Sequence, residues 1–411
     1  MSCENINITT QPVSIAGTNT DAFGRLRVSQ PYTLFDSQNR YAIDPQFDTS
    51  VVTGGSTTYL PNESSVRMDV STASGAEVVR QTFRSFPYQP GKGLLVLATF
   101  VMNAAKTNLR QRAGYFGVQN GVFFQLNNTT KSFILRTYIS GSVDDTTRKV
   151  DQSDWNGDKL DGTGASGLTL DLTKPQILWM DFEWLGVGNV RCGFIINGQY
   201  IVCHTYQTAN VTGTSVYMTT AILPLRYEIT NTAATGSASY LKQICSTVLS
   251  EAGYEQTSIE HVATMVSATG GTYITTTYKP LVSIRLASGS LGAVVIPYNV
   301  NFLPTTADNY QIALLKNGTL TSASYGAVSS DANVEFDITA SAITGGTLVY
   351  SEFLTSKSGR SSLSGAAAAF NFDLQLGASL TGVSDVYSLC ARTVSGSGGG
   401  IGLLSFFDLT Q

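Results

Sequence analysis

The sequence is poor in charge: only 13% of its 411 residues are Asp, Glu, Lys or Arg, against about 25% in an average soluble chain. No run of Lys or Arg stands out and the formal net charge is −4, so general affinity for nucleic acid is not expected. The longest apolar run, LLVLATFVM at residues 94–102, falls well short of the ~20 residues that span a bilayer. The start, MSCENINITTQP, lacks the basic and apolar stretches of an export signal, so we expect no membrane contact and no export.

The sequence is also poor in the residues that most often carry chemistry. It contains five cysteines, an odd number, and only two histidines, which agrees with reduced thiols in a cytosol rather than a disulfide framework. The motifs H-E-x-x-H, C-x-x-C and G-x-S-x-G are absent, and so are a P-loop and a dinucleotide-binding G-x-G-x-x-G before a helix. We therefore predict no enzyme and no cofactor.

The missing charge is replaced by Gly, Ser, Thr, Asn, Val, Tyr and Phe, which favour strands and tight turns over helices. Short apolar runs recur from about residue 51 to the C-terminus, separated by turn dipeptides such as Asn120-Gly121. We predict an all-β protein with three parts: an extended N-terminal arm for docking over residues 1–50, a large concanavalin-like or jelly-roll β-sandwich over 51–256, and a smaller β-sandwich over 257–411.

The stretch RCGFIINGQYIVCH at residues 191–204 brings two cysteines close to a histidine and raises the question of a metal or redox site. Asn197-Gly198 at its centre is typical of a two-residue type I′ turn, so we predict a structural hairpin in which Cys192 lies directly opposite Cys203. Because side chains alternate along a strand, His204 is predicted to point away from both thiols, and one zinc ion cannot collect ligands from both faces. Two buried thiols are the favoured interpretation; a disulfide between them stays open.

A second polar stretch, DDTTRKVDQSDWNGDKLDGTG, runs over residues 144–164. Asp154, Asn156 and Asp158 imitate the first three ligands of a calcium loop, but Lys159 stands where such a loop has glycine and no glutamate closes it. An ordered surface loop with Trp155 packed beneath it is the simpler interpretation. We keep the three residues as candidates for a cation loop and predict no metal.

The segment WMDFEW contains an aromatic residue and two acids at alternate positions. Trp179, Asp181 and Glu183 would share one face of a strand, with the two carboxylates about 6.5 Å apart. Paired carboxylates beside a ring are how some jelly rolls cut glycans, but no other element supports catalysis and a solvated strand face is the favoured interpretation. We retain these three residues as candidates for glycan binding.

Several segments resemble a group of virion structural proteins of tailed bacteriophages, common in environmental and marine phages. They are DAFGRLRVS, YQPGKG at 88–93, GYFGVQNGVFFQL, DWNGDKLDGTG and FEWLGVGNVRCGFIINGQYIVCHTY, and the resemblance spans residues 20–255. It implies a role in particle architecture and carries over no catalytic residue.

From the resemblance and the low charge we expect a non-enzymatic component of the tail, baseplate or fibre-attachment apparatus. It would be assembled in the host bacterial cytoplasm and located in the virion. We expect a homo-oligomer, with a trimer among the candidate states, in contact with other virion proteins. The alternatives are a lectin-like module that binds a host surface glycan, a capsid-surface decoration protein and, third, a glycan depolymerase.

Overall fold

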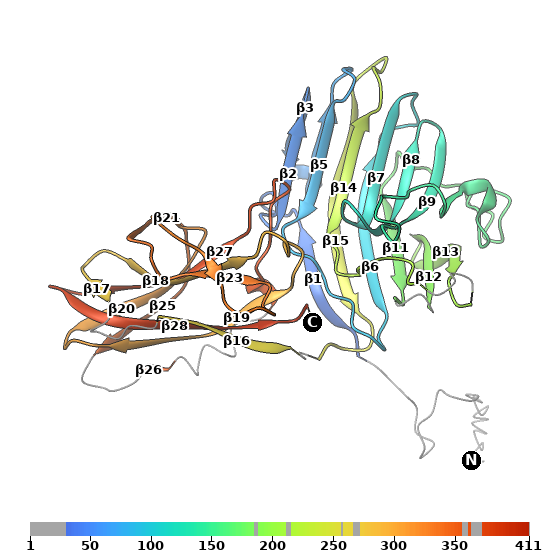
Figure 1. The fold of residues 1–411 in the computed structure, drawn as a ribbon. Helices are drawn as coiled ribbons and strands as arrows, with labels where there is room; N and C mark the ends of the chain where they lie inside the picture. Colours follow the sequence, from blue (N-terminus) through green and yellow to red (C-terminus); the bar gives the residue numbers. More distant parts are fainter. Residues whose placement is uncertain are drawn as a thin grey trace, which may run out of the picture.

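The computed structural model describes residues 30–184, 188–210, 215–255, 258–265, 272–355, 361–362 and 372–410. Within these ranges the regular structure is β-strands with a few single-turn 3-10 helices, at Pro61–Glu63, Gln152–Asp154 and Phe372–Leu374. The strands form two sandwiches that lie side by side, and the strands of one run across the direction of the other (Figure 1). The predicted all-β class with a larger and a smaller sandwich is confirmed. No helix in the described ranges is long and apolar enough to cross a membrane.

The first sandwich consists of two antiparallel sheets. The eight-stranded sheet contains, in spatial order, β13 (Gln199–Gln207), β12 (Asn189–Ile196), β11 (Gln176–Phe182), β6 (Leu94–Met102), β15 (Ser239–Ser250), β4 (Ser65–Val70) and β3 (Gly55–Leu60), with β1 (Tyr32–Gln38) also paired to β15. The seven-stranded sheet contains β10 (Lys149–Asp151), β9 (Thr130–Arg136), β8 (Gly121–Asn127), β7 (Leu109–Phe116), β14 (Leu225–Asn231), β5 (Glu77–Thr82) and β2 (Phe47–Val52).

The apolar alternation of the strands builds the core between these sheets. On β6, Val96, Ala98 and Phe100 are fully buried, whereas Leu95 and Leu97 on the other face are partly exposed. This is the period of two expected for a strand with one face in a core. Aromatic rings fill the centre of the sandwich and pack edge to face, with centroid distances of 5.3 Å for Phe124–Phe194 and 5.5 Å for Phe124–Phe133.

The described part of the predicted arm belongs to this sandwich. β1 pairs with β15 through, for example, Phe35 and Val248, and β2 pairs with β5. Phe35 and Phe47 are both buried in the core of this sandwich. The predicted boundary near residue 50 is therefore wrong, because residues 32–50 supply apolar side chains that fill this core. Residues 1–29, the rest of the arm, lie outside the described residues.

A charged cluster covers part of the outer face of the seven-stranded sheet. Glu228 on β14 is 4% exposed and accepts from Arg110 at 2.9 Å and from Arg226 at 3.2 Å, with Arg112 at 3.5 Å. The Arg112 guanidinium also lies 5.1 Å from the ring centroid of Phe123, a cation–π distance. Burial raises the pKa of Glu228, but the three arginines outweigh it and hold that pKa below its usual range. We call these residues the Glu228 cluster.

The second sandwich is smaller and its two principal sheets are also antiparallel. One sheet contains β16 (Ile259–Thr264), β28 (Gly398–Asp408), β19 (Val295–Pro304) and β26 (Ser361–Ser362), with β17 (Thr272–Ile274) also paired to β28. The other contains β22 (Gly326–Ala327), β23 (Val334–Asp337), β18 (Lys279–Leu286), β27 (Val386–Thr393), β20 (Asn309–Lys316) and β25 (Thr347–Thr355). A separate two-stranded ribbon pairs β21 (Thr319–Thr321) with β24 (Ala342–Thr344).

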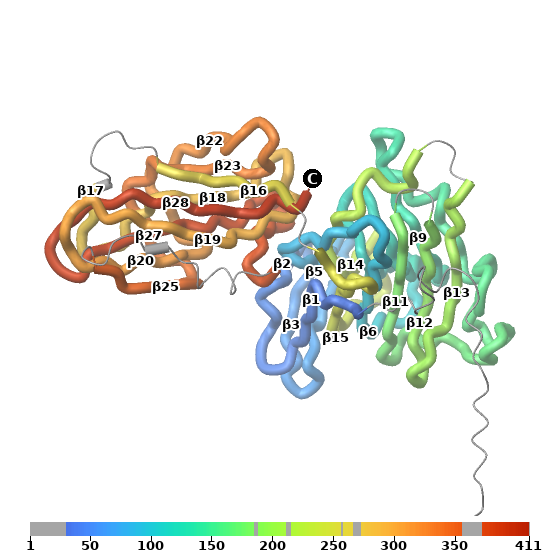
Figure 2. Tube along the Cα trace, turned by 90° about the horizontal axis from the view of Figure 1, so that it is seen from below, coloured from blue at the N-terminus to red at the C-terminus, as the bar shows by residue number. Residues whose placement is uncertain are grey.

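Side chains from the second half of the chain help to complete the core of the first sandwich. At the start of β19, Val295 points into the core of the second sandwich, while its neighbours Val294 and Ile296 belong to the core of the first. Leu409, directly after β28, joins the first core as well. Backbone and side-chain hydrogen bonds cross the same junction, including Ala378 N–H to the Phe83 carbonyl at 2.9 Å. The chain therefore ends beside the junction (Figures 1 and 2), and the two sandwiches form one continuous packed body.

Candidate functional site

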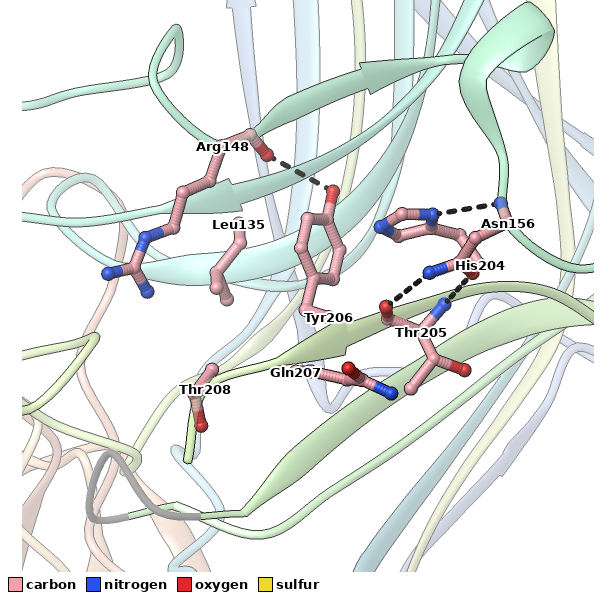
Figure 3. A pocket seen from close by; sticks show the side chains of 8 residues that line it. All are labelled: Leu135, Arg148, Asn156, His204, Thr205, Tyr206, Gln207 and Thr208. Carbon is pink, nitrogen blue, oxygen red and sulfur yellow. Dashed lines mark hydrogen bonds between the residues drawn. The ribbon is translucent and has the colours of Figure 1, made fainter. Parts of the chain in front are cut away.

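A pocket opens at the edge of the first sandwich, where β13 of one sheet faces β9 and β10 of the other. We call it the edge pocket. It has a volume of about 330 Å³, within the range of ~300–1,000 Å³ that is usual for small-ligand sites. In Figure 3, Arg148 and Leu135 lie on one side, His204 and Asn156 on the other, and Tyr206 between them. The residues that line it are Leu135, Arg148, Asn156, His204, Thr205, Tyr206, Gln207 and Thr208.

One wall of the edge pocket is a loop that caps the free edge of β13. The side chain of Asn156 donates to the Thr205 carbonyl at 2.9 Å and accepts from the Thr205 N–H at 2.8 Å. The N–H of Gly157 donates to the Cys203 carbonyl at 2.8 Å, so the loop satisfies an edge that would otherwise attract another chain. A Cβ at residue 157 would collide with the Val202 carbonyl oxygen, which explains the glycine.

The predicted hairpin is present, and its register changes partway along. β12 and β13 are joined at Asn197-Gly198, with φ of 51° and 77°, as a type I′ turn requires. The expected pairs hold as far as Gly193 opposite Val202, and a β-bulge follows. Cys203 is the extra residue of that bulge.

Beyond the bulge, Cys192 pairs with His204. The prediction that Cys192 lies opposite Cys203 is therefore wrong. Directly opposed residues share a face, so the prediction that His204 points away from the thiols is wrong as well.

The bulge brings both thiols and the imidazole to the inner face, where burial keeps them neutral. Burial raises the pKa of Cys192 well above its ordinary value and that of Cys203 to about 12, and it lowers the pKa of His204. The His204 Nδ1 accepts from the Asn156 N–H at 3.4 Å (Figure 3). Since the thiolate is the form that binds metals and attacks disulfides, this trio is better described as core packing. Both cysteines are free thiols.

We expect the buried thiols to resist alkylation in the folded protein. Cys192, Cys203 and Cys390 are 0% exposed, so iodoacetamide at pH 8 should modify them at least ~100-fold more slowly than in the unfolded chain. Peptide mass spectrometry after timed labelling measures these rates. Cys245, which is partly exposed, is the internal control and should react faster than the other three. Equal rates at all four positions would contradict the packing described here.

Two of the three candidates for a cation loop have partners of their own. The side chain of Asn156 is bonded to Thr205, as described above, and Asp158 accepts from the backbone N–H groups of Leu160 at 2.9 Å and Ser166 at 2.6 Å. Asp154 is exposed. Within the described ranges, no three His, Cys, Asp or Glu side chains are grouped to hold a metal ion. The loop is ordered by these bonds and by Trp155, which is 2% exposed and packs 4.7 Å from Phe133.

The side chains of Trp179 and Asp181, within β11, and of Glu183, directly after it, lie along the outer face of the strand, but their environments differ. Trp179 is only 3% exposed, because Tyr200 packs 5.4 Å from its ring and its indole N–H donates to the Ile201 carbonyl at 3.3 Å. Asp181 is buried and forms a two-point ion pair with Arg191, its cross-strand neighbour, with Nε 2.8 Å from Oδ1. Glu183 is exposed at the end of the strand.

A third acid, not singled out from the sequence, joins the pair. Glu251, just after β15, lines with Asp181, Glu183 and Arg191 a groove of about 250 Å³. Burial raises the pKa of Glu251, and the charges of Asp181 and Glu183 add to that effect against Arg191. A hydrolase needs one carboxylate free to act as nucleophile or base beside the acid. Asp181 is committed to Arg191 and is not available for that role. Glu183 and Glu251 are the other two carboxylates of the groove.

A larger cleft, of about 410 Å³, lies at the junction of the sandwiches and is lined by Tyr88, Trp184 and Tyr254 among others. These rings are held by the fold: Trp184 donates its indole N–H to the Met218 carbonyl at 3.0 Å, and Tyr254 packs edge to face 4.9 Å from Phe372. These contacts pack the two halves of the chain together beside the cleft.

Comparison with known proteins gives matches of fold only. No family model and no curated protein matches the chain. Among solved structures, the CBM2 module of the evolved Dit protein of Lactobacillus casei BL23 phage J-1 aligns with a TM-score of 0.35 and 8% identity, covering 55% of this chain and 99% of that one. The legume lectin-like domain from Entamoeba histolytica aligns with a TM-score of 0.31 and 10% identity, covering 52% and 95%.

A β-glucanase from Bacillus licheniformis aligns to the same degree, with a TM-score of 0.34 and 10% identity, covering 53% of this chain and 96% of that one. Sugar-binding modules and a glucanase thus align equally well, and at these identities and TM-scores the alignments carry no argument about what this chain does.

Proposed function

We propose that the chain is a non-enzymatic structural component of a tailed-bacteriophage virion, in its tail, baseplate or fibre-attachment apparatus, and that it assembles as a homo-oligomer. The observation that carries the proposal is the structural role of the segments that resemble phage virion proteins. DWNGD caps the edge of β13, and VRCGFIINGQYIVCH forms the bulged hairpin beneath it. The side chains of Asn156 and Asp158 are bonded to backbone groups, which is the use expected in an architectural part.

The shared core supports the same proposal. A particle component transmits force between its neighbours, and two domains joined only by a linker move independently by default. Here Val294, Ile296 and Leu409 complete the core of the first sandwich, so both halves move as one body. The low proportion of charged residues, 13%, reduces the cost of desolvation at contacts within an assembly.

For a depolymerase, Asp181 is not an available carboxylate, since it is held by Arg191. The capsid-surface alternative differs from the tail proposal in location alone. The lectin-like alternative is supported by one specific observation: the guanidinium of Arg148, which lines the edge pocket, forms no ion pair with any described residue.

The proposal is tested by locating the chain in intact particles. Purified virions of the phage that carries this gene should contain the protein in a fixed, repeated copy number by quantitative mass spectrometry. Antibody-gold labelling should place it on the tail rather than the capsid. Absence from purified virions would overturn the structural role, and labelling over the head would assign it to capsid decoration instead.

Self-association is tested on the recombinant full chain. At micromolar concentration, mass photometry and sedimentation velocity should give a single closed oligomer rather than a monomer. A monomer in solution together with a single copy per particle would contradict the homo-oligomer.

A further inference from the structure

Arg148 is fixed across the open edge of the first sandwich. Its carbonyl oxygen accepts from the Leu135 N–H on β9 at 3.2 Å and from the Tyr206 hydroxyl on β13 at 3.1 Å. These two bonds tie the residue to both sheets, so its backbone cannot drift away from the opening. The guanidinium is thereby held against one side of the edge pocket (Figure 3).

Within the described ranges, the guanidinium forms no ion pair at contact distance; the carboxylate of Asp144 acts on it only at longer range. Its Nη1 atom is buried without a hydrogen bond, and the structure gives the side chain no ion pair among the described residues. Several other arginines of this sandwich do have a carboxylate partner: for example, Arg112 and Arg136 share Asp145, and Arg191 holds Asp181. A buried charged donor left without an acceptor is costly, and burial accordingly lowers the pKa of Arg148.

The rest of the pocket defines the kind of ligand that the Arg148 guanidinium would bind. No other Lys or Arg lines it, and His204 is neutral at pH 7 because burial lowers its pKa. The pocket therefore offers a single positive charge in a planar, two-pronged form, and one charge balances a carboxylate monoanion more closely than a phosphate dianion. Leu135 and Tyr206 provide an apolar surface, and Thr205 and Gln207 provide hydroxyl and amide groups. An apolar surface with a hydrogen-bonding rim suits the two faces of a sugar ring.

We propose that the edge pocket binds the carboxylate of an acidic saccharide, such as a uronic acid residue of a surface glycan, with Arg148 as its ion-pair partner. The inference goes beyond the proposed architectural role and does not depend on it. A chain absent from virions could still bind the sugar, and a tail component could lack the site.

The test titrates the recombinant full chain with monosaccharides up to about 20 mM, which is enough to detect a Kd of millimolar order. Glucuronate should bind, by calorimetry and by saturation-transfer NMR, at least tenfold more tightly than glucose. Glucose 6-phosphate tests whether the pocket prefers a carboxylate or a phosphate, and it should bind more weakly than glucuronate. Equal binding of glucuronate and glucose, no binding of either, or a preference for the phosphate would overturn the proposal.

Variants locate the site. Arg148→Met should weaken glucuronate binding at least tenfold, and Arg148→Lys should weaken it less. The matched control is Arg40→Met, which removes an arginine that is exposed elsewhere on the first sandwich and should leave binding unchanged. Gln207→Ala alters an exposed residue of the pocket and should weaken binding about threefold even if the Arg148 variants fold poorly. Unchanged binding in both Gln207→Ala and Arg148→Met would place the sugar elsewhere and contradict the proposal.

Discussion

Replacing Glu228 by glutamine is expected to lower the free energy of unfolding by about 3–5 kcal/mol, the cost of removing one partner from a buried ion network. Glu228 is the common partner of Arg110, Arg112 and Arg226. Arg112 is 8% exposed, so in the variant its charge would stay buried with only Asp145 nearby. Chemical denaturation followed by circular dichroism measures the change.

The matched control is Glu335→Gln in the second sandwich. Its partner Arg285 is 41% exposed at the side chain and Glu335 itself 26%, so this pair is expected to contribute at most about 1 kcal/mol. Similar losses in the two variants would show that the Glu228 cluster is no more than a surface network.

The pH dependence of the same variant follows from the lowered pKa of Glu228. A carboxyl group whose pKa is lower in the folded than in the unfolded state stabilises the fold above its unfolded pKa, about 4.3. That contribution is lost as the pH falls through the folded pKa. The difference in unfolding free energy between wild type and Glu228→Gln should therefore be constant from pH 7 to 5 and shrink below about pH 4.

Replacing Ile296 by aspartate is expected to separate the unfolding of the two sandwiches. The wild-type chain should unfold in a single calorimetric transition, because the junction belongs to the core of the first sandwich. Ile296 is 0% exposed, and a carboxylate there would have to be desolvated without a partner or drive the junction open, a loss of several kcal/mol, about 3 or more. Differential scanning calorimetry should then show two transitions, the first well below the wild-type midpoint.

Leu303→Asp on the same strand is the control for the charge itself. Leu303 is 48% exposed, so this substitution should change stability by no more than about 0.5 kcal/mol and keep one transition. A single, unshifted transition for Ile296→Asp would show that the two sandwiches are coupled by something other than this contact.

The parts of the fold that local chemistry determines could be predicted from the sequence. Strand content follows from the alternation of apolar residues, and Asn197-Gly198 specified the turn of the β12–β13 hairpin. The register beyond Gly193 could not be predicted, because the bulge at Cys203 is matched by a bond from Gly157, which is distant in sequence. A one-residue bulge reverses which face the following side chains occupy, and so the predicted position of His204 was wrong.

The junction between the two sandwiches could not be predicted from the sequence for a different reason. The segment AVVIPYNVNFL at 293–303 is apolar at consecutive positions, a pattern that indicates burial on both faces but does not say against what. Val295 faces one sandwich and Ile296 the other, and only the arrangement of the two sandwiches assigns them.

The candidate sites were predicted less well than the fold. Asp181 and Glu183 lie along the same strand face, as expected. Their neighbours Arg191 and Glu251 come from other parts of the sheet, and these neighbours determine the charge and pairing of the two acids. Arg148 lies within the polar stretch at 144–164, yet no motif marks it. The signal is its missing partner, which appears only when the two sheets are brought together.

The continuity of the core at Ile296 and Leu409 also constrains how the gene can be divided. A fragment that stopped after residue 255 would leave the first sandwich open to water at the end that these side chains cover, and we expect it to be insoluble. Recombination between related genes could then exchange the two halves only as a matched pair, so variation in the second sandwich should accumulate in its loops rather than by replacement of the whole sandwich.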